Sequence, residues 1–399
     1  MGVIIGVAGL ALVVAGCDLG RKPVIYTGVP GQDIAAGDVN GDGDVDFVTV
    51  GVPDIGVLLG DGAGAFTTRT FDDGDDNPSP LTVALADVDS DGHLDLIRDN
   101  PFVHNGNVTD SVLFQRGDGT GAFGSPITLP PPGVPFSEVV DIATGDLDRD
   151  GDADVVATLS SSDIVTYLGD GSGNFSLGLV RQLRMVFQTA VVDLDGDGDL
   201  DLVSTGGQDQ GSSNVAAWIV VQRGNGRGGF GTPEQHLTGD PVYSVTNALA
   251  VLDLDRDGHL DVVASVNPDG TETSLPIVFP GEPDGGLGAP RRPAWDLQTA
   301  VNDLGTADID RDRITDLVVV NRNGGGEVLF GTGTGNLVDR HGLATGVNGS
   351  ATLAVADVNH DGRTDLVISG QPCPFVSTAC DPPSVGVMIN ALNGRPAPT

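Results

Sequence analysis

A nine-residue acidic pattern, Asp-x-Asp/Asn-x-Asp-Gly-x-x-Asp, recurs seven times and constrains the fold more than any other feature of the sequence. The copies begin at Asp38, Asp87, Asp146, Asp193, Asp253, Asp308 and Asp357, at intervals of 47 to 60 residues. A repeat of this length is typical of architectures in which each copy builds one structural unit. We therefore interpret the chain as seven copies of one unit.

Each copy of the pattern lies between two short runs of β-branched and apolar residues, which are residues 33–37 and 46–50 in the first repeat. A third apolar run follows and ends in a Gly-rich turn, often with an aromatic residue such as Phe66 directly after it. Each repeat thus predicts a strand, the acidic loop, a strand, a connection, a strand, the Gly-rich turn and a last strand. Four antiparallel strands in about 50 residues indicate one blade of a β-propeller.

The predicted fold is all-β: a seven-bladed β-propeller of four-stranded antiparallel blades, with the acidic loops between strands 1 and 2 of each blade. The last repeat lacks a fourth strand, whereas residues 23–27 are strand-like and precede the first complete repeat. We expect this N-terminal run to close the ring as the outer strand of the last blade, because an open propeller would expose two sheet edges. A parallel solenoid, whose coils are usually shorter than these repeats, is the weaker alternative.

The acidic loops have the oxygen-rich composition of calcium sites, because Ca²⁺ takes six to eight oxygen ligands. Positions 1, 3, 5 and 9 of each loop would supply side chains, and position 7 would supply its backbone carbonyl. A helical EF-hand is excluded, since position 12 of the first loop is Thr49, inside a predicted strand. The predicted ligands are Asp38, Asn40, Asp42, Asp44 and Asp46; Asp87, Asp89, Asp91, His93 and Asp95; Asp146, Asp148, Asp150, Asp152 and Asp154; Asp193, Asp195, Asp197, Asp199 and Asp201; Asp253, Asp255, Asp257, His259 and Asp261; Asp308, Asp310, Asp312, Ile314 and Asp316; and Asp357, Asn359, Asp361, Arg363 and Asp365.

Turn formation alone would explain any single loop, because Asp and Gly both favour turns. Seven groups of carboxylates at one point of every repeat favour a cation instead, since close carboxylates repel one another. We expect about seven Ca²⁺ ions, with a structural role preferred over sensing or catalysis. In the sixth loop Arg313 replaces the Gly of position 6, which predicts either the weakest of the seven sites or an empty site with Arg313 turned toward the carboxylates.

These repeats resemble the FG-GAP or VCBS repeats of integrin α-subunit propellers and of many exported bacterial proteins. Residues 38–46 followed by 56–62 are similar to a typical unit, and Phe123-Gly124, Phe230-Gly231 and Phe330-Gly331 match its Phe-Gly pair. The resemblance covers roughly residues 24–390 and implies a seven-bladed propeller with calcium in loops on one face. It leaves the function open, because members of the family include adhesion modules, lectins and accessory domains of enzymes.

The two ends of the chain predict export. Residues 3–15 are apolar but too short to span a bilayer as a helix, and residues 14–17 resemble a bacterial lipobox that ends in Cys17. We expect a signal peptide at 1–16, a lipidated linker at 17–23, the propeller at 24–394 and a tail at 395–399; an ordinary cleaved signal is the alternative. In an exported protein, the closely spaced Cys373 and Cys380 favour a disulfide.

A formal net charge of −37 disfavours nucleic acid as a partner. No His-Glu-x-x-His or Gly-x-Ser-x-Gly motif occurs, so we expect no enzyme. The expected function is a monomeric binding or scaffold module of the cell envelope, with a lipid anchor in the membrane and a protein or glycan ligand on the face opposite the calcium loops. Trp295, Arg291 and Arg292 are the candidate ligand contacts on that face. A lectin with repeated sugar sites and a propeller-fold polysaccharide-cleaving enzyme are the alternatives.

Overall fold

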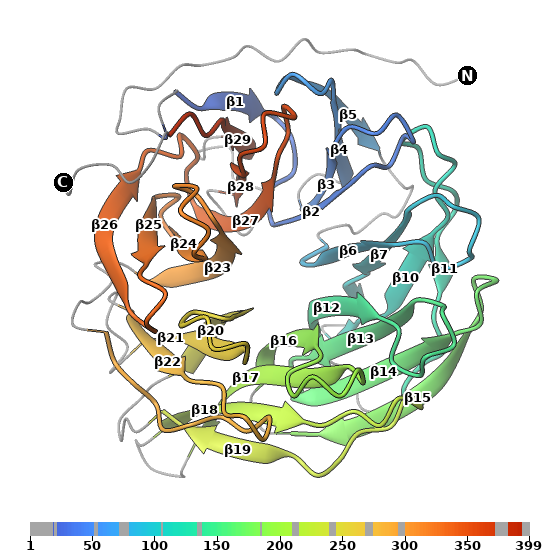
Figure 1. The fold of residues 1–399 in the computed structure, drawn as a ribbon. Coiled ribbons are helices and arrows are strands. Elements are labelled where there is room, and N and C mark those ends of the chain that lie inside the picture. The colour runs from blue at the N-terminus through green and yellow to red at the C-terminus, as the bar shows by residue number, and fades with distance from the viewer. Residues whose placement is uncertain are drawn as a thin grey trace, which may run out of the picture.

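The computed structural model describes residues 19, 22–51, 55–71, 80–104, 107–133, 138–183, 186–209, 215–238, 245–267, 274–293, 300–371 and 382–392. Seven antiparallel sheets stand around a central axis, as Figure 1 shows, so the prediction of a seven-bladed all-β propeller is confirmed. The innermost strand of each blade contacts the innermost strand of the next, and the last contacts the first. The ring is therefore closed.

The blades follow the sequence repeats. The first four consist of β2 (Asp33–Gly37), β3 (Asp46–Val50), β4 (Ile55–Gly60) and β5 (Phe66–Phe71); β6 (Val83–Ala86), β7 (Asp95–Asp99), β10 (Val112–Gln115) and β11 (Ile127–Thr128); β12 (Val139–Gly145), β13 (Asp154–Leu159), β14 (Asp163–Gly169) and β15 (Phe175–Gln182); and β16 (Val186–Val192), β17 (Asp201–Asp209), β18 (Val215–Gln222) and β19 (Glu234–Leu237). The last three consist of β20 (Val245–Leu252), β21 (Asp261–Asn267) and β22 (Leu275–Phe279); β23 (Val301–Ala307), β24 (Asp316–Asn321), β25 (Gly326–Gly331) and β26 (Leu337–Leu343); and β27 (Ser350–Ala356), β28 (Asp365–Gln371), β29 (Ser384–Met388) and β1 (Val24–Thr27). In every blade the acidic loop joins strands 1 and 2.

The N-terminal strand β1 closes the ring as the sequence predicts. It pairs antiparallel with β29, with Val24 opposite Val387 and Thr27 opposite Ser384, and so forms the outer edge of the last blade. Ile25 of this strand is 3% exposed. Hydrogen bonds between the two ends of the chain thus remove the two edges that an open ring would leave.

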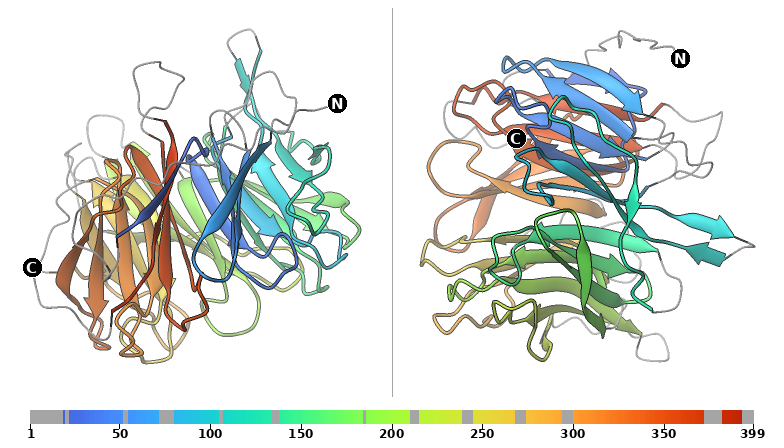
Figure 2. Two further views of the ribbon diagram at one scale, coloured as in Figure 1. Left: turned by 90° about the horizontal axis from the view of Figure 1, so that it is seen from above. Right: turned by 90° about the vertical axis from the view of Figure 1, so that its right-hand side faces the viewer.

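Blade 5 differs from the predicted four strands. Among its described residues it has three strands, and the outer edge consists there of two isolated bridges, in which Val278 pairs with Arg291 and Gly281 with Leu287. Proline cannot donate a backbone hydrogen bond to a sheet, and Pro290 adjoins the first of these bridges. In blade 2, a short hairpin of β8 (Phe102–His104) and β9 (Asn107–Thr109) lies between strands 2 and 3 and projects from the side of the ring opposite the acidic loops (Figure 2).

The hydrophobic core lies between neighbouring blades. One cluster joins Ile97 and Phe114 of blade 2 to Val155 and Tyr167 of blade 3, and the other clusters bridge blades in the same way. Second strands such as β3 and β13 are buried along their whole length because a blade covers each of their two faces. Trp218 of β18 is 2% exposed and belongs to this core.

Polar side chains on the innermost strands connect successive blades. They stand five residues before the first Asp of the acidic loop, and each accepts a hydrogen bond from a backbone N–H of the next blade at 2.7 to 2.9 Å. The pairs are Asp33 with Val83, Asp141 with Thr189, Gln188 with Leu249, and Asp303 with Leu353. These four bonds fix the height of one blade relative to the next.

Several predictions concern residues outside the described part of the chain. They are the signal peptide at 1–16, the lipidated Cys17, the Cys373–Cys380 disulfide and the ligand contact Trp295. They therefore stay predictions. Among the described residues, none belongs to a helix with the length and apolar character needed to cross a membrane.

The three aspartates of the innermost strands predict a pH dependence of stability. Burial raises the pKa of Asp33 to about 6 and that of Asp141 and Asp303 to about 7, whereas an aspartate of the unfolded chain titrates near pH 3.9. The folded state therefore retains protons that the unfolded state has lost, and the free energy of unfolding falls as pH rises from about 4 to 7.

Asp141→Asn keeps an oxygen that can accept the Thr189 N–H and removes the charge. Its stability relative to the unsubstituted protein should rise with pH, by at most about 1.4 kcal/mol per pH unit. Urea unfolding of both proteins in the same buffers from pH 4.5 to 7.5 measures this difference. Parallel pH profiles would contradict the prediction.

Candidate metal centres

The aspartate at position 9 organises each acidic loop. It is buried in all seven loops, each of which the structure describes in full. One of its carboxylate oxygens accepts the N–H of position 2 at 2.7 to 3.1 Å. The other accepts the N–H of the residue after the third strand's apolar run, such as Gly60 in blade 1, at 2.6 to 2.9 Å. The carboxylate thus joins the loop to two strands of its own blade.

Positions 1 and 5 shape the rest of the loop. The carboxylate of position 1 accepts the N–H of position 6 at 2.7 to 3.1 Å, and that of position 5 accepts the N–H of position 7 at 2.8 to 3.0 Å. The backbone turns through positive φ at both positions 4 and 6. Position 4 holds a residue other than Gly in five loops, namely Ser90, Arg149, Arg256, Arg311 and His360, a strain that the sequence pattern did not reveal.

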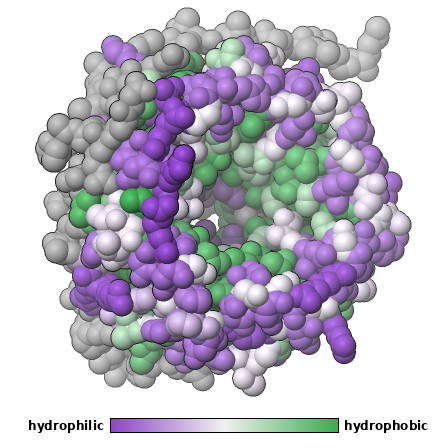
Figure 3. Space-filling model, viewed as in Figure 1, coloured by the Kyte–Doolittle hydropathy of each residue, from purple (hydrophilic) through white to green (hydrophobic). Residues whose placement is uncertain are grey.

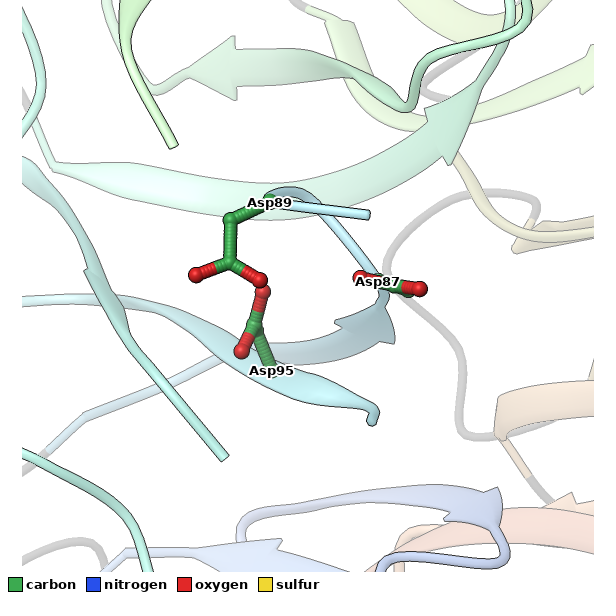
Figure 4. A group of neighbouring side chains, drawn as sticks. All are labelled: Asp87, Asp89 and Asp95. Carbon is green, nitrogen blue, oxygen red and sulfur yellow. The ribbon is translucent and has the colours of Figure 1, made fainter. Parts of the chain in front are cut away.

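Five of the seven loops gather three carboxylates whose oxygens lie within 4.8 Å of one another. Figure 4 shows the group in the second loop, where Asp87, Asp89 and Asp95 lie around a common space and the carboxylates of Asp89 and Asp95 face each other. The five groups are Asp87, Asp89 and Asp95; Asp146, Asp148 and Asp154; Asp193, Asp195 and Asp197; Asp253, Asp255 and Asp261; and Asp308, Asp310 and Asp316. The first and seventh loops have Asn40 and Asn359 at position 3, and so have one carboxylate fewer at that point.

Four of these groups contain a buried carboxylate oxygen that has no hydrogen-bond partner within the described structure. These oxygens are the Oδ1 atoms of Asp89, Asp148 and Asp255, all at position 3, and of Asp308 at position 1. A buried charged oxygen without a partner is costly. A cation that binds there would remove this cost, so the residues fit a metal ion, and a set of oxygen ligands without sulfur or imidazole favours Ca²⁺ over Zn²⁺.

The same environment weakens ionisation of the position 9 carboxyl groups. Burial raises the pKa of Asp46, Asp95, Asp154 and Asp365 to about 6 and that of Asp316 to about 7. The two backbone N–H groups oppose this rise, while the carboxylates at positions 1, 3 or 5 add to it. A bound cation would return these groups to their ionised form.

The acidic loops also touch the neighbouring blade. The N–H groups of Gly121, Gly173 and Gly228, each in a Gly-rich turn, donate to the position 2 carbonyl of the preceding blade's loop at 3.0 to 3.1 Å. Side chains at position 4 of one loop meet those at position 7 of the next. His360 Nε2 lies 2.7 Å from Asp44 Oδ1, and Arg149 Nε lies 2.7 Å from Asp199 Oδ1. Each loop is thus part of an interface between blades.

Arg291 does not lie where the sequence analysis placed it. Its backbone exchanges two hydrogen bonds with Val278, next to the last residue of β22 and near the Gly-rich turn of blade 5. Its Nη1 and the Cβ of Asp255 both lie within 4 Å of the point where a Cβ on Gly335 would stand, so Arg291 belongs to the acidic-loop side of the ring. The prediction that it lies on the opposite face is wrong, because the Pro-rich segment around it concealed the outer edge of the blade. Arg292 is exposed.

The fold and the loops define a seven-bladed propeller with repeated acidic clusters suited to metal ions. The FG-GAP-like repeat family matches residues 38–97, 102–157, 146–204, 193–264 and 308–368, which together exceed half of the chain. The chain belongs to the FG-GAP-like repeat family, which confirms the resemblance drawn from the acidic loops. A search of the curated proteins gave no match.

Solved structures share this fold at low sequence identity. A crystal structure of BBS1N in complex with ARL6DN, soaked with lead, matches with a TM-score of 0.56 and 12% identity over 96% of this chain and 98% of that chain. A crystal structure of BBS1N in complex with ARL6DN soaked with mercury matches with a TM-score of 0.53 and 11% identity over the same shares. At these identities the likeness concerns the fold alone.

The sixth loop yields a prediction about backbone strain. Arg313 occupies position 6 with φ 67°, whereas Gly occupies this position in the other six loops. Arg313→Gly should stabilise the protein by about 1 kcal/mol, because Gly adopts positive φ without the cost borne by a residue with a Cβ. Calcium affinity at this loop should rise as well, because a positive charge leaves the neighbourhood of Asp308, Asp310 and Asp316.

Arg313→Ala is the matched control, since it removes the charge but keeps the Cβ. Chemical denaturation and calcium titration of both variants separate the two effects. We expect the gain in stability only in the Gly variant, and the gain in calcium affinity in both. Equal stability of the Gly variant and the unsubstituted protein would contradict the strain argument.

Proposed function

We propose that this propeller is a calcium-stabilised binding or scaffold module of the cell envelope. The observation that supports calcium is the set of buried carboxylate oxygens without partners in loops 2, 3, 5 and 6. These oxygens belong to the acidic loops of four separate blades, where coordinated ions would each replace the repulsion of three carboxylates by attraction. Loops 1 and 7 offer an amide oxygen at position 3, which is also a calcium ligand.

The ions would strengthen the interfaces between blades as well as the loops themselves. Position 9 links each loop to its own blade, and positions 2, 4 and 7 contact the neighbouring blades. Calcium at the loops would therefore hold both sets of contacts in one geometry. In this role the metal is structural, and the opposite face remains for a ligand.

Figure 3 views the ring as Figure 1 does and shows hydrophilic residues along much of the rim, with hydrophobic residues in the central hollow. We place the ligand-binding surface on the face opposite the acidic loops, where the connections between strands 2 and 3 of the blades vary most in length. The ligand is a protein or a glycan, and an anchor on Cys17 would hold the module at the membrane.

Calcium should control thermal stability. Chelation should lower the melting temperature, because each ion adds its binding free energy to the folded state, about 2.7 kcal/mol per site at a hundredfold excess over the dissociation constant. Differential scanning calorimetry in calcium and in chelator measures the effect. Asp255→Ala, which removes the ligand oxygen, should reduce the response, whereas Asp61→Ala, in the Gly-rich turn of blade 1, should leave the response to chelator intact. An unchanged melt in excess chelator would refute the calcium assignment.

The ligand-binding face can be tested with one pair of variants. Trp295→Ala should weaken binding to a glycan array or to fractionated envelope proteins by roughly tenfold or more, as expected for an aromatic contact at the centre of an interface. Arg291→Ala, on the acidic-loop side, should leave binding unchanged. Loss of binding in the Arg291 variant alone would place the ligand on the acidic-loop face. Binding at several equivalent sugar sites would favour the lectin.

A further inference from the structure

Arg223 reaches into the fourth acidic loop. It follows β18 and precedes Gly224, whose N–H binds the position 9 carboxylate of Asp201. Its Nη1 lies 2.8 Å from Asp201 Oδ2 and 3.6 Å from Asp195 Oδ2, and its Nη2 donates to the carbonyl of Gly285 in blade 5. The guanidinium therefore contacts positions 3 and 9, which are two of the predicted metal ligands.

The fourth loop differs from the other acidic groups at these two positions. In loops 2, 3, 5 and 6 the gathered carboxylates come from positions 1, 3 and 9, whereas in loop 4 they come from positions 1, 3 and 5, and Asp201 is not among them. In loops 2, 3 and 5 the position 3 carboxylate has a buried oxygen without a partner, but no oxygen of Asp195 is in that state. The difference coincides with the contact between Arg223 and the position 9 carboxylate of Asp201, since Arg116, at the same place in blade 2, contacts Asp89 at position 3.

A second arginine reaches the same loop from blade 3. Arg149, at position 4 of the third loop, places its Nε 2.7 Å from Asp199 Oδ1 and 3.2 Å from the carbonyl of Gly198. Its Nη2 donates to the carbonyl of Asp197 at 3.0 Å. Two guanidinium groups thus offset part of the negative charge of the five carboxylates in loop 4. The ion pair of Arg223 and Asp201 is screened less by solvent than an exposed ion pair, because the two side chains are only 22% and 2% exposed.

We infer that Arg223, assisted by Arg149, is the resident cation of the fourth loop, so that this loop keeps its geometry without a metal ion. The inference rests on the proposed calcium binding, because it sets loop 4 apart from loops that need the ion. The guanidinium supplies the positive charge between positions 3 and 9, and it also ties blade 4 to the turn of blade 5. Loop 4 is then the calcium-independent member of the ring.

Hydrogen exchange on the unsubstituted protein tests this directly. Chelation should raise the exchange rates of the Gly151 and Gly169 amides of blade 3 by roughly tenfold or more, as expected when a bound ion is lost. The corresponding amides of blade 4, Gly198 and Gly224, should change far less. Equal acceleration in both blades would overturn the inference and leave calcium binding intact. No acceleration in either blade would overturn both.

Arg223→Leu provides a second measurement, because Leu stands at the same place in blades 1 and 3, as Leu59 and Leu168. Native mass spectrometry and calorimetric titration should show one more bound Ca²⁺ in this variant, and its blade 4 amides should become sensitive to chelator. Arg116→Leu is the matched control: Arg116 contacts Asp89 at 3.1 Å in a loop whose positions 1, 3 and 9 are already gathered. Its ion count should not change. A folded Arg223 variant with an unchanged ion count would also overturn the inference.

Discussion

The structure depends on a buried aspartate at the start of the second strand of each blade. This aspartate accepts two backbone hydrogen bonds. Burying a carboxylate is costly, and the two N–H donors recover only part of that cost, since the pKa of Asp46 and Asp316 remains raised by burial. The loops therefore need either a proton on these carboxyl groups or a positive charge close to them. This requirement explains why a motif that shapes the backbone is also a motif that would bind a cation.

The loops matter beyond their own blades because their edges carry contacts around the ring. Turn glycines donate to the loop of the preceding blade, and position 4 meets position 7 of the next loop, as His360 meets Asp44 across the junction between the last blade and the first. On the inner side, Asp33, Asp141 and Asp303 accept N–H groups from the next blade. The ring is thus fastened by polar contacts at two levels, with the hydrophobic clusters between them.

The sequence was sufficient for the number of blades, the place of the loops and the closure by β1, because all three follow from the repeat and its incomplete last copy. It was insufficient where a contact joins different repeats. Arg149 looks like an ordinary surface residue until it meets Asp199 of the next blade, and Arg223 of blade 4 reaches the carbonyl of Gly285 in blade 5. Arg291 was misplaced because prolines conceal the outer edge of blade 5. The inner aspartates could have been found by their common spacing, since Asp33, Asp141 and Asp303 each stand five residues before the first Asp of their loop.

Several residues depart from the repeat, and a contact elsewhere in the ring offsets the cost of the departure. Gly would remove the strain at position 4, yet the side chain of Arg149 or His360 there gains an ion pair with the next loop. Leu168 is an apolar residue that precedes Gly169 at the end of the third strand of blade 3. Arg223 stands at the equivalent place in blade 4 and brings a positive charge to Asp195 and Asp201. Identical backbone loops can therefore differ in how their negative charge is balanced, and that difference is set by residues outside the motif.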